Sequence, residues 1–222
     1  MFNKLYLLIT LLFFTTVCAF YDYFSVRSRD YNVCYDRHTT SDHISYPDVN
    51  LETITTRTLF KFCFTFMGVV LFAAEMERTG GCLLTSLRRI FSFLPYVTSG
   101  LCWCGLFLWV VKLRVGRLRP CYIAGCKPGE DESCTNTNYH YYCQSFFSGH
   151  AMMACYLMGC VSVYVARCKL RLGSLLHAGC VFVAVGISYS RLLDHQHHLS
   201  DVIVGAAVGI FSSILVHWQT AN

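Results

Sequence analysis

Long apolar stretches alternate with short polar connections along this chain, and six of the stretches approach the length that crosses a membrane. A bilayer core of roughly 30 Å needs about 20 mostly apolar residues in helical conformation. The six stretches are residues 5–20, 58–74, 90–111, 148–166, 172–189 and 202–218. Because a spanning segment must satisfy its own backbone hydrogen bonds, we predict an all-α fold, an integral membrane bundle of six transmembrane helices in one domain over residues 1–222.

The composition agrees with a membrane protein and excludes other classes. Hydrophobic residues make up 55% of the 222 residues and charged residues only 14%, whereas about a quarter of the residues of a soluble domain are charged. The mean hydropathy is +0.44. These values exclude a soluble globule, a disordered chain and a collagen-like fibre.

The first stretch, residues 5–20, has two interpretations. Lys4, a short apolar core and the small residues around Cys18 and Ala19 also describe a cleaved secretory signal peptide. In both cases the Lys-flanked start stays in the cytosol, and residue 21 onwards emerges across the membrane. The alternation that follows places three segments on the outer face, residues 21–57, 112–147 and 190–201.

Charge does not decide this orientation. Inner loops usually carry the excess of Lys and Arg, yet the inner segments contain seven of these residues and the outer segments ten. Three of the outer residues, Lys112, Arg119 and Arg191, are assigned to a site below, and without them each side carries seven. The orientation stays open on charge alone.

Four of the 14 cysteines gather in the outer segment 112–147. They are Cys121, Cys126, Cys134 and Cys143. In an oxidising compartment they allow three pairings, and the sequence does not choose among them. We expect at least one bridge, because a long loop is costly to order without one; a reduced, unpaired set is the alternative.

Three polar clusters flank the apolar stretches. Residues 112–120 follow the third stretch, residues 146–151 open the fourth, and residues 190–201 connect the fifth to the sixth. Under an alternating topology all three lie on one membrane face. Because ionisable groups beside a bilayer are expensive and usually functional, we predict a site where the clusters meet.

The residue types in these clusters suit a phosphate group. Lys112, Arg119 and Arg191 supply three cations, and an Arg fork matches two phosphate oxygens while Lys adds a point charge. Ser148 and Gly149 open a helix, whose free N–H groups and positive dipole end also favour an anion. We therefore predict that these five residues bind phosphate.

Two histidines and an aspartate in the same clusters could perform phosphoryl transfer. His197 and Asp201 are four residues apart, which places them on one helical face if the last helix begins there. A carboxylate bonded to one ring nitrogen fixes the tautomer and leaves the other nitrogen as a nucleophile. His150 would then protonate the leaving oxygen as general acid.

Each cluster alone has a simpler explanation. A basic stretch after a span is commonly a headgroup anchor, and Ser-Gly-His is commonly a helix N-cap. The run His195, His197 and His198 could instead ligate zinc. The conjunction of the three clusters on one face favours a site.

The clusters together resemble the signature of the lipid phosphate phosphatases, the membrane branch of the type 2 phosphatidic acid phosphatase superfamily. The flanking runs GRLRP and SFFSGHA and the acidic stretch at residues 41–47 are also similar to that branch. The signature positions are Lys112, Arg119, Pro120, Ser148, Gly149, His150, Ser190, Arg191, His197 and Asp201.

The resemblance implies a six-helix fold with cytosolic termini and an extracellular or lumenal active site, in the plasma membrane or an endomembrane. It implies that His197 forms a phosphohistidine, that Asp201 orients it and that His150 protonates the leaving alkoxide. Substrates would be lipid phosphomonoesters such as phosphatidate, lysophosphatidate, sphingosine 1-phosphate and ceramide 1-phosphate. No metal, magnesium, other cofactor or nucleic acid is implied; the partners are the substrate and the bilayer, and a homo-oligomer is left open.

The chain departs from the family pattern at two positions. Phe147 stands where the wider superfamily has Pro, and Leu199 replaces a common Pro. Other functions stay open: a catalytically silent relative that binds or scaffolds lipids, a phosphatase for a sugar phosphate or polyprenyl diphosphate, and a six-span transporter. Silent relatives lose motif His or Arg residues, and this chain keeps them.

Overall fold

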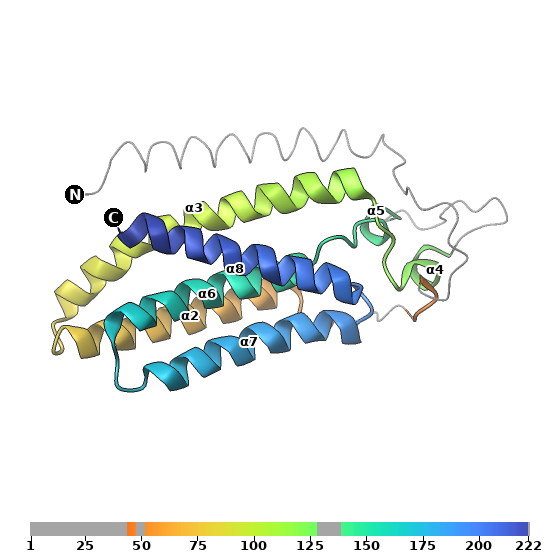
Figure 1. Ribbon diagram of the computed structural model, residues 1–222. Helices are drawn as coiled ribbons and strands as arrows, with labels where there is room; N and C mark the ends of the chain where they lie inside the picture. The colour runs from red at the N-terminus through yellow and green to blue at the C-terminus, as the bar shows by residue number, and fades with distance from the viewer. Residues whose placement is uncertain (1–43, 48–51, 128–138, 222) are drawn as a thin grey trace.

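The described part of the chain consists mainly of helices (Figure 1). The computed structural model describes residues 44–47, 52–127 and 139–221, and within them no strand is present, which agrees with the predicted all-α class. The first predicted span lies outside these residues. The helices are α2 (Thr56–Arg78), α3 (Leu83–Val115), α4 (Tyr122–Cys126), α5 (Tyr139–Tyr142), α6 (Gly149–Cys168), α7 (Gly173–Leu193) and α8 (Leu199–Ala221).

Five of these helices are long and apolar enough to cross a bilayer. They are α2, α3, α6, α7 and α8, and they correspond to the five predicted stretches that the structure describes. Each helix continues past the predicted C-terminal boundary, because backbone hydrogen bonding carries on into polar residues after the apolar run has ended. As a result Lys112 lies on the last turn of α3.

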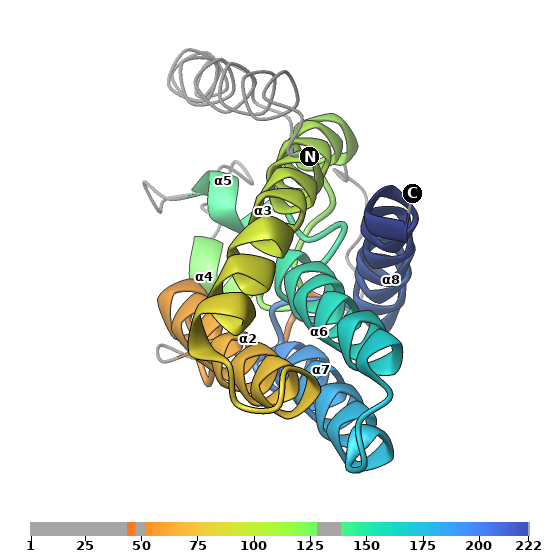
Figure 2. The ribbon, with the colours of Figure 1, turned by 90° about the vertical axis from the view of Figure 1, so that its left-hand side faces the viewer.

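Helix α6 is the centre of the bundle. Figure 2 shows it surrounded by α2, α3, α7 and α8, and it contacts all four. Side chains around its whole circumference are buried, among them Met152, Tyr156 and Val161, as expected for a helix that is apolar on every side. The Tyr156 hydroxyl donates to the Val97 carbonyl of α3 at 2.7 Å.

Two glycines of α8 allow it to approach α6 closely. A Cβ at Gly205 would lie 2.4 Å from the Ser148 carbonyl oxygen, and one at Gly209 would lie 2.3 Å from that of Met152. Small residues four apart let two membrane helices bring their backbones together. The first turn of α8 therefore reaches the start of α6, where the Ser148 N–H donates to the Asp201 carbonyl at 3.0 Å.

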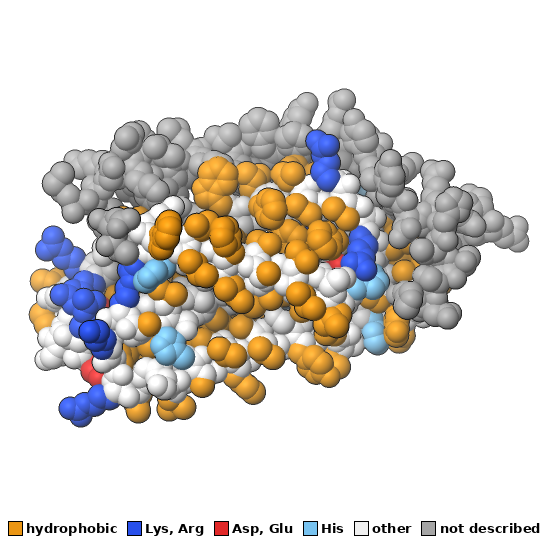
Figure 3. Space-filling model, in the orientation of Figure 1, with side chains coloured by type: hydrophobic (Ala, Val, Ile, Leu, Met, Phe, Trp, Pro, Cys, Tyr) orange, Lys and Arg blue, Asp and Glu red, His pale blue; other side chains and the backbone are white. Residues whose placement is uncertain are grey.

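The outer surface has the distribution of a membrane protein. Figure 3 shows hydrophobic side chains across the middle of one face and Lys and Arg side chains gathered at the end where α2 turns into α3. Large apolar side chains such as Val69, Phe182 and Phe211 are more than half exposed. Because so much exposed apolar surface is unfavourable in water, we conclude that this is a multi-pass membrane protein.

The charged end is held by a buried carboxylate. Glu75 of α2 is fully buried and pairs with Arg78 at 3.3 Å and with Arg89 of α3 at 3.4 Å. It also accepts a hydrogen bond from the Tyr164 hydroxyl of α6 at 2.7 Å. One paired charge thus ties three helices together.

The opposite end carries the connecting segments with α4 and α5 (Figure 1). Tyr46 packs there, donating its N–H to the Pro120 carbonyl at 3.1 Å and stacking on His195 with ring centroids 4.7 Å apart. Cys126 and Cys143, two of the four cysteines of segment 112–147, each form a disulfide bond.

Candidate active site

A cavity of about 200 Å³ lies among the helices at the end of the bundle that carries α4 and α5. Segments far apart in the sequence contribute to it, and six of the eight site residues predicted from the sequence line it. The lining residues are Glu52, Thr56, Leu59, Phe60, Leu108, Lys112, Arg119, Tyr141, Gly149, His150, Met153, Arg191 and His197.

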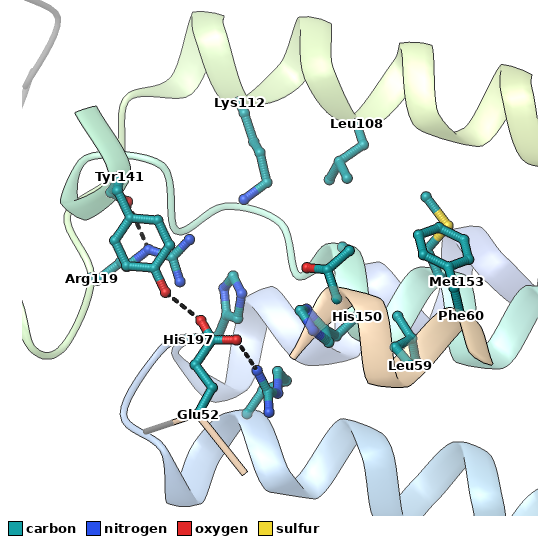
Figure 4. A pocket seen from close by; sticks show the side chains of 13 residues that line it. Glu52, Leu59, Phe60, Leu108, Lys112, Arg119, Tyr141, His150, Met153 and His197 are labelled. Carbon is teal, nitrogen blue, oxygen red and sulfur yellow. Dashed lines mark hydrogen bonds and ion pairs between the residues drawn. The ribbon is translucent and has the colours of Figure 1, made fainter. Parts of the chain in front are cut away.

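The cavity has a polar end and an apolar end. Figure 4 shows Lys112, Arg119 and His197 around one part of it, while the side chains of Leu59, Phe60, Leu108 and Met153 line the other. The apolar part is built from α2, α3 and α6, which are membrane-spanning helices. The shape therefore suits a ligand with a charged head and an apolar body.

Arg119 is fixed beside the polar end by the segments that surround it. Its Nε donates to the Tyr141 carbonyl at 2.7 Å, and its Nη1 donates to the carbonyl and side-chain oxygens of Gln196 at 3.0 and 2.8 Å. The guanidinium also lies over the Tyr141 ring, 4.0 Å from its centroid. These hydrogen bonds use Nε and Nη1 and leave Nη2 for an anion.

Arg191 is 1% exposed and is oriented by two carboxylates. Its Nη2 donates to Asp194 at 2.7 Å, and its Nη1 lies 3.5 Å from Glu52. Glu52 also accepts a hydrogen bond from the Tyr141 hydroxyl at 2.6 Å. Because a buried cation needs compensation, these carboxylates stabilise the guanidinium at the cavity wall.

Lys112 and the start of α6 complete the cationic side. The Lys112 ammonium donates to the Gln144 carbonyl at 2.6 Å. Ser148 is the N-cap of α6, its hydroxyl accepting from the Ala151 N–H at 3.4 Å, and it is fully buried behind the cavity rather than lining it. Gly149 lines the cavity, and a Cβ there would lie 2.8 Å from Leu108 Cδ2.

His150 lines the cavity from the first turn of α6. Its Nε2 is buried and has no hydrogen-bond partner among the described residues. Since buried polar atoms are nearly always paired, an unpaired ring nitrogen in a cavity wall is suited to contact a ligand.

His197 has a defined tautomer. Its Nδ1 lies 2.7 Å from the Ser145 carbonyl oxygen, which can only accept, so Nδ1 carries the proton and Nε2 has the lone pair. Burial and the nearby cations Arg119 and Lys112 hold the pKa of His197 well below its usual value. The ring is therefore neutral at neutral pH, as a nucleophile requires.

The direct hydrogen bond expected between Asp201 and His197 is not observed. Helix α8 begins at Leu199, so His197 precedes the helix, and its Nδ1 is 4.0 Å from the carboxylate. Asp201 is fully buried and instead accepts from the Ser145 hydroxyl at 2.6 Å and from Arg117. The expected shared helical face depended on the last helix beginning at His197, and this condition is not met because α8 begins at Leu199.

Comparison with known proteins identifies the family. The family model described as PAP2 superfamily matches residues 90–222, which include all eight predicted site residues. The chain belongs to the PAP2 superfamily.

Curated relatives of this PAP2 protein match it over part of their length. The chain is 33% identical to phospholipid phosphatase 1 of Rattus norvegicus over 125 residues, covering 48% of the chain and 44% of the relative. It is 32% identical over 123 residues to phospholipid phosphatase 2 of Mus musculus, covering 48% and 45%. The matches thus span less than half the length of these relatives. No solved structure matches the chain.

The histidine run of this PAP2 protein does not converge on one point. His195 stacks on Tyr46, His197 faces Ser145, and His198 Nδ1 lies 3.3 Å from Asp201. In the part of the chain that the structure describes, no group of three or more His, Cys, Asp or Glu side chains is arranged to hold a metal ion.

Several residues at the PAP2 site were not predicted from the sequence. Glu52 and Tyr141 line the cavity, while Ser145 and Arg117 contact Asp201 behind it. The signal for Glu52 was weak: it follows the acidic stretch at residues 41–47 that resembles the family. Ser145 and Arg117 stand inside the recognised runs SFFSGHA and GRLRP, but their contacts depend on how three loops meet.

Proposed function

We propose that this PAP2 protein is an integral-membrane lipid phosphate phosphohydrolase that removes phosphate from lipid phosphomonoesters. The observation that carries the proposal is the two-ended cavity, in which cations and histidines face a wall built by membrane-spanning helices. The curated relatives are named phospholipid phosphatases. Phosphatidate, lysophosphatidate, sphingosine 1-phosphate and ceramide 1-phosphate all have the required charged head and apolar body.

In the first step of the proposed reaction, Lys112, Arg119 and Arg191 bind the phosphate oxygens. His197 Nε2 attacks phosphorus, and an N–P bond forms as the P–O bond to the lipid breaks. Protonated His150 gives its proton to the leaving alkoxide, which departs as the lipid alcohol. The cations stabilise the charge on the transferring group, which dominates catalysis of phosphoryl transfer.

In the second step, water replaces the lipid alcohol. His150 Nε2, now neutral, takes a proton from the water as its oxygen attacks phosphorus. The N–P bond breaks, inorganic phosphate leaves, and His197 returns to its neutral form. Because the chain supplies the charge stabilisation, we expect turnover without magnesium.

We also propose that the site faces the extracellular or lumenal side. Disulfides form in oxidising compartments, and Cys126 and Cys143 belong to the segment beside the cavity. At the opposite end of the bundle, Arg78 ends α2, Arg88 and Arg89 follow on α3, and Lys169 and Arg171 lie in the α6–α7 connection, and cytosolic ends of spans usually carry such an excess of Lys and Arg. In addition Arg117, one of the seven remaining outer cations in the charge count, forms an ion pair with buried Asp201. Its positive charge is therefore balanced within the protein.

The test is phosphate release from lysophosphatidate by membranes that contain the protein, measured in EDTA without added magnesium. We expect activity in the wild type and none in His197→Ala at equal membrane level, while His195→Ala, which lies outside the cavity, stays active. Activity abolished by chelation would contradict the metal-independent mechanism. A fully active His197→Ala would contradict the nucleophile, and an inactive wild type would favour the silent-scaffold alternative.

A further inference from the structure

Ser145 contacts both the Asp201 carboxylate and the His197 ring. It is fully buried, and each of its three polar groups has a partner. Its N–H donates to the Arg117 carbonyl at 2.9 Å, its hydroxyl donates to Asp201 Oδ2 at 2.6 Å, and its carbonyl accepts from His197 Nδ1 at 2.7 Å. One residue thus joins the carboxylate to the ring.

Asp201 is held away from the ring by its other contacts. Its carboxylate accepts from Arg117 and from the His198 N–H at 3.1 Å, and it remains 4.0 Å from His197 Nδ1, beyond hydrogen-bond distance. The Asp201 carboxylate therefore forms its hydrogen bonds with the loops around the cavity and not with the ring, and the Ser145 hydroxyl is one of its partners.

We infer that Ser145 is a positioning residue for His197, and that Asp201 acts on the ring through Ser145 rather than by direct contact. This inference rests on the proposed function, in which His197 Nε2 is the nucleophile. The Ser145 carbonyl fixes the tautomer and the plane of the ring. Two other bonds fix the position of Ser145 itself: its hydroxyl donates to the Asp201 carboxylate, and its N–H donates to the Arg117 carbonyl.

Loss of the Ser145 hydroxyl would change the surroundings of the ring in a defined direction. Asp201 would lose one partner and could turn toward Nδ1, where a carboxylate favours the charged imidazolium. The other groups near the ring are Lys112 on α3, Arg119 after it and His150 on α6, and these disfavour the charged ring. The pKa of His197 would therefore rise in Ser145→Ala.

The first experiment compares Ser145→Ala with Ser145→Thr in the full chain, in membranes. We expect Ser145→Ala to lower kcat by about tenfold to a hundredfold. A loss of this size is typical when a metal-binding side chain loses the residue that orients it. KM should change little, because Ser145 does not line the cavity. The acid limb of the kcat profile should move to higher pH. Ser145→Thr keeps the hydroxyl and should restore most of kcat and the original profile.

The matched control removes a buried serine hydroxyl that does not contact Asp201 or His197. Ser188 on α7 is buried and donates to the Ala184 carbonyl of its own helix at 2.7 Å. Ser188→Ala should keep the wild-type kcat and pH profile. A Ser145→Ala variant that behaves like this control would overturn the inference.

A double-mutant cycle tests whether Asp201 acts through Ser145. If it does, the double variant Ser145→Ala with Asp201→Asn should be about as active as the less active of the two single variants. Losses that multiply would show that Asp201 acts on His197 independently. Should Ser145→Ala fail to accumulate, Ser145→Cys, with a weaker donor, takes its place and should have intermediate activity.

A measurement without turnover separates this inference from the proposed function. Diethyl pyrocarbonate modifies neutral imidazole, so modification of His197 against pH, followed by mass spectrometry, reports the titration of the ring. The midpoint should be higher in Ser145→Ala than in the wild type. If the wild type hydrolyses no lipid phosphate but the midpoint is higher in Ser145→Ala, the proposed function is contradicted and the role of Ser145 stands. If the two proteins have equal midpoints, the inference about Ser145 is overturned.

Discussion

Glu52 places a negative charge in a cavity wall whose other charged side chains are cationic. It lies 3.5 Å from Arg191. It also accepts a hydrogen bond from the Tyr141 hydroxyl, as Figure 4 shows. A phosphate entering this cavity would have to compete with the carboxylate for the guanidinium and would be repelled by it. We therefore expect Glu52 to weaken the affinity of this cavity for anions.

We predict that Glu52→Gln binds phosphate more tightly than the wild type. The amide keeps an acceptor for Tyr141 but loses the ion pair with Arg191, and a partly exposed pair contributes up to about 1 kcal/mol, roughly fivefold in affinity. Inhibition constants for orthovanadate and inorganic phosphate should fall by several-fold. Glu52→Asp, which keeps the charge, is the control. Weaker inhibition in Glu52→Gln would show that the carboxylate supports anion binding.

At the scale of elements, the contact between α6 and α8 decides how the site is assembled. Gly205 and Gly209 bring the backbones together, and this contact sets Ser148 against the first turn of α8. Any side chain at either position meets backbone atoms of α6, which cannot move aside as a flexible side chain could.

We predict that Gly209→Ala destabilises the protein and that Gly186→Ala does not. A Cβ at Gly209 would meet the Met152 carbonyl, whereas nothing lies within 4 Å of a Cβ at Gly186 on α7. Overpacking of this kind costs about 1–3 kcal/mol. The measurement is the midpoint of thermal inactivation in detergent micelles. Equal midpoints for the two variants would contradict the close approach.

The elements were largely predictable from the sequence, because a run of apolar residues has few alternatives in a bilayer. The five described spans follow the predicted stretches, and the three polar clusters meet at one cavity. The link between Asp201 and His197 was not predictable, because it depends on the helix starting at Leu199. Ser145 was missed for a related reason: its role follows from contacts of three loops that no spacing encodes.

At the scale of the whole molecule, the two ends of the bundle differ in chemistry. One end has the cavity and the disulfide-bonded cysteines, and the other has the charged turns around Glu75. Cys82 is exposed at this second end, in the connection between α2 and α3. A hydrogen bond with Thr85 lowers the pKa of the Cys82 thiol, which favours the reactive thiolate.

We predict that Cys82 is shielded from reagents outside the cell or vesicle. A membrane-impermeant maleimide should label it only after permeabilisation, whereas a cysteine introduced as Lys127→Cys, next to α4, should react in intact preparations. Cys82→Ser is the control for background labelling. Labelling of Cys82 before permeabilisation, with Lys127→Cys protected, would reverse the proposed orientation.

The close contact of α6 with α8 also has a consequence for biosynthesis. Helix α6 leaves the ribosome well before α8, yet α8 is its most extensive neighbour. Until α8 arrives, the Ser148 N–H lacks the Asp201 carbonyl that it meets in the folded chain. We therefore expect the proposed phosphate site to stay incomplete in the nascent protein until α8 has been made, and a chain released before residue 199 to lack phosphatase activity.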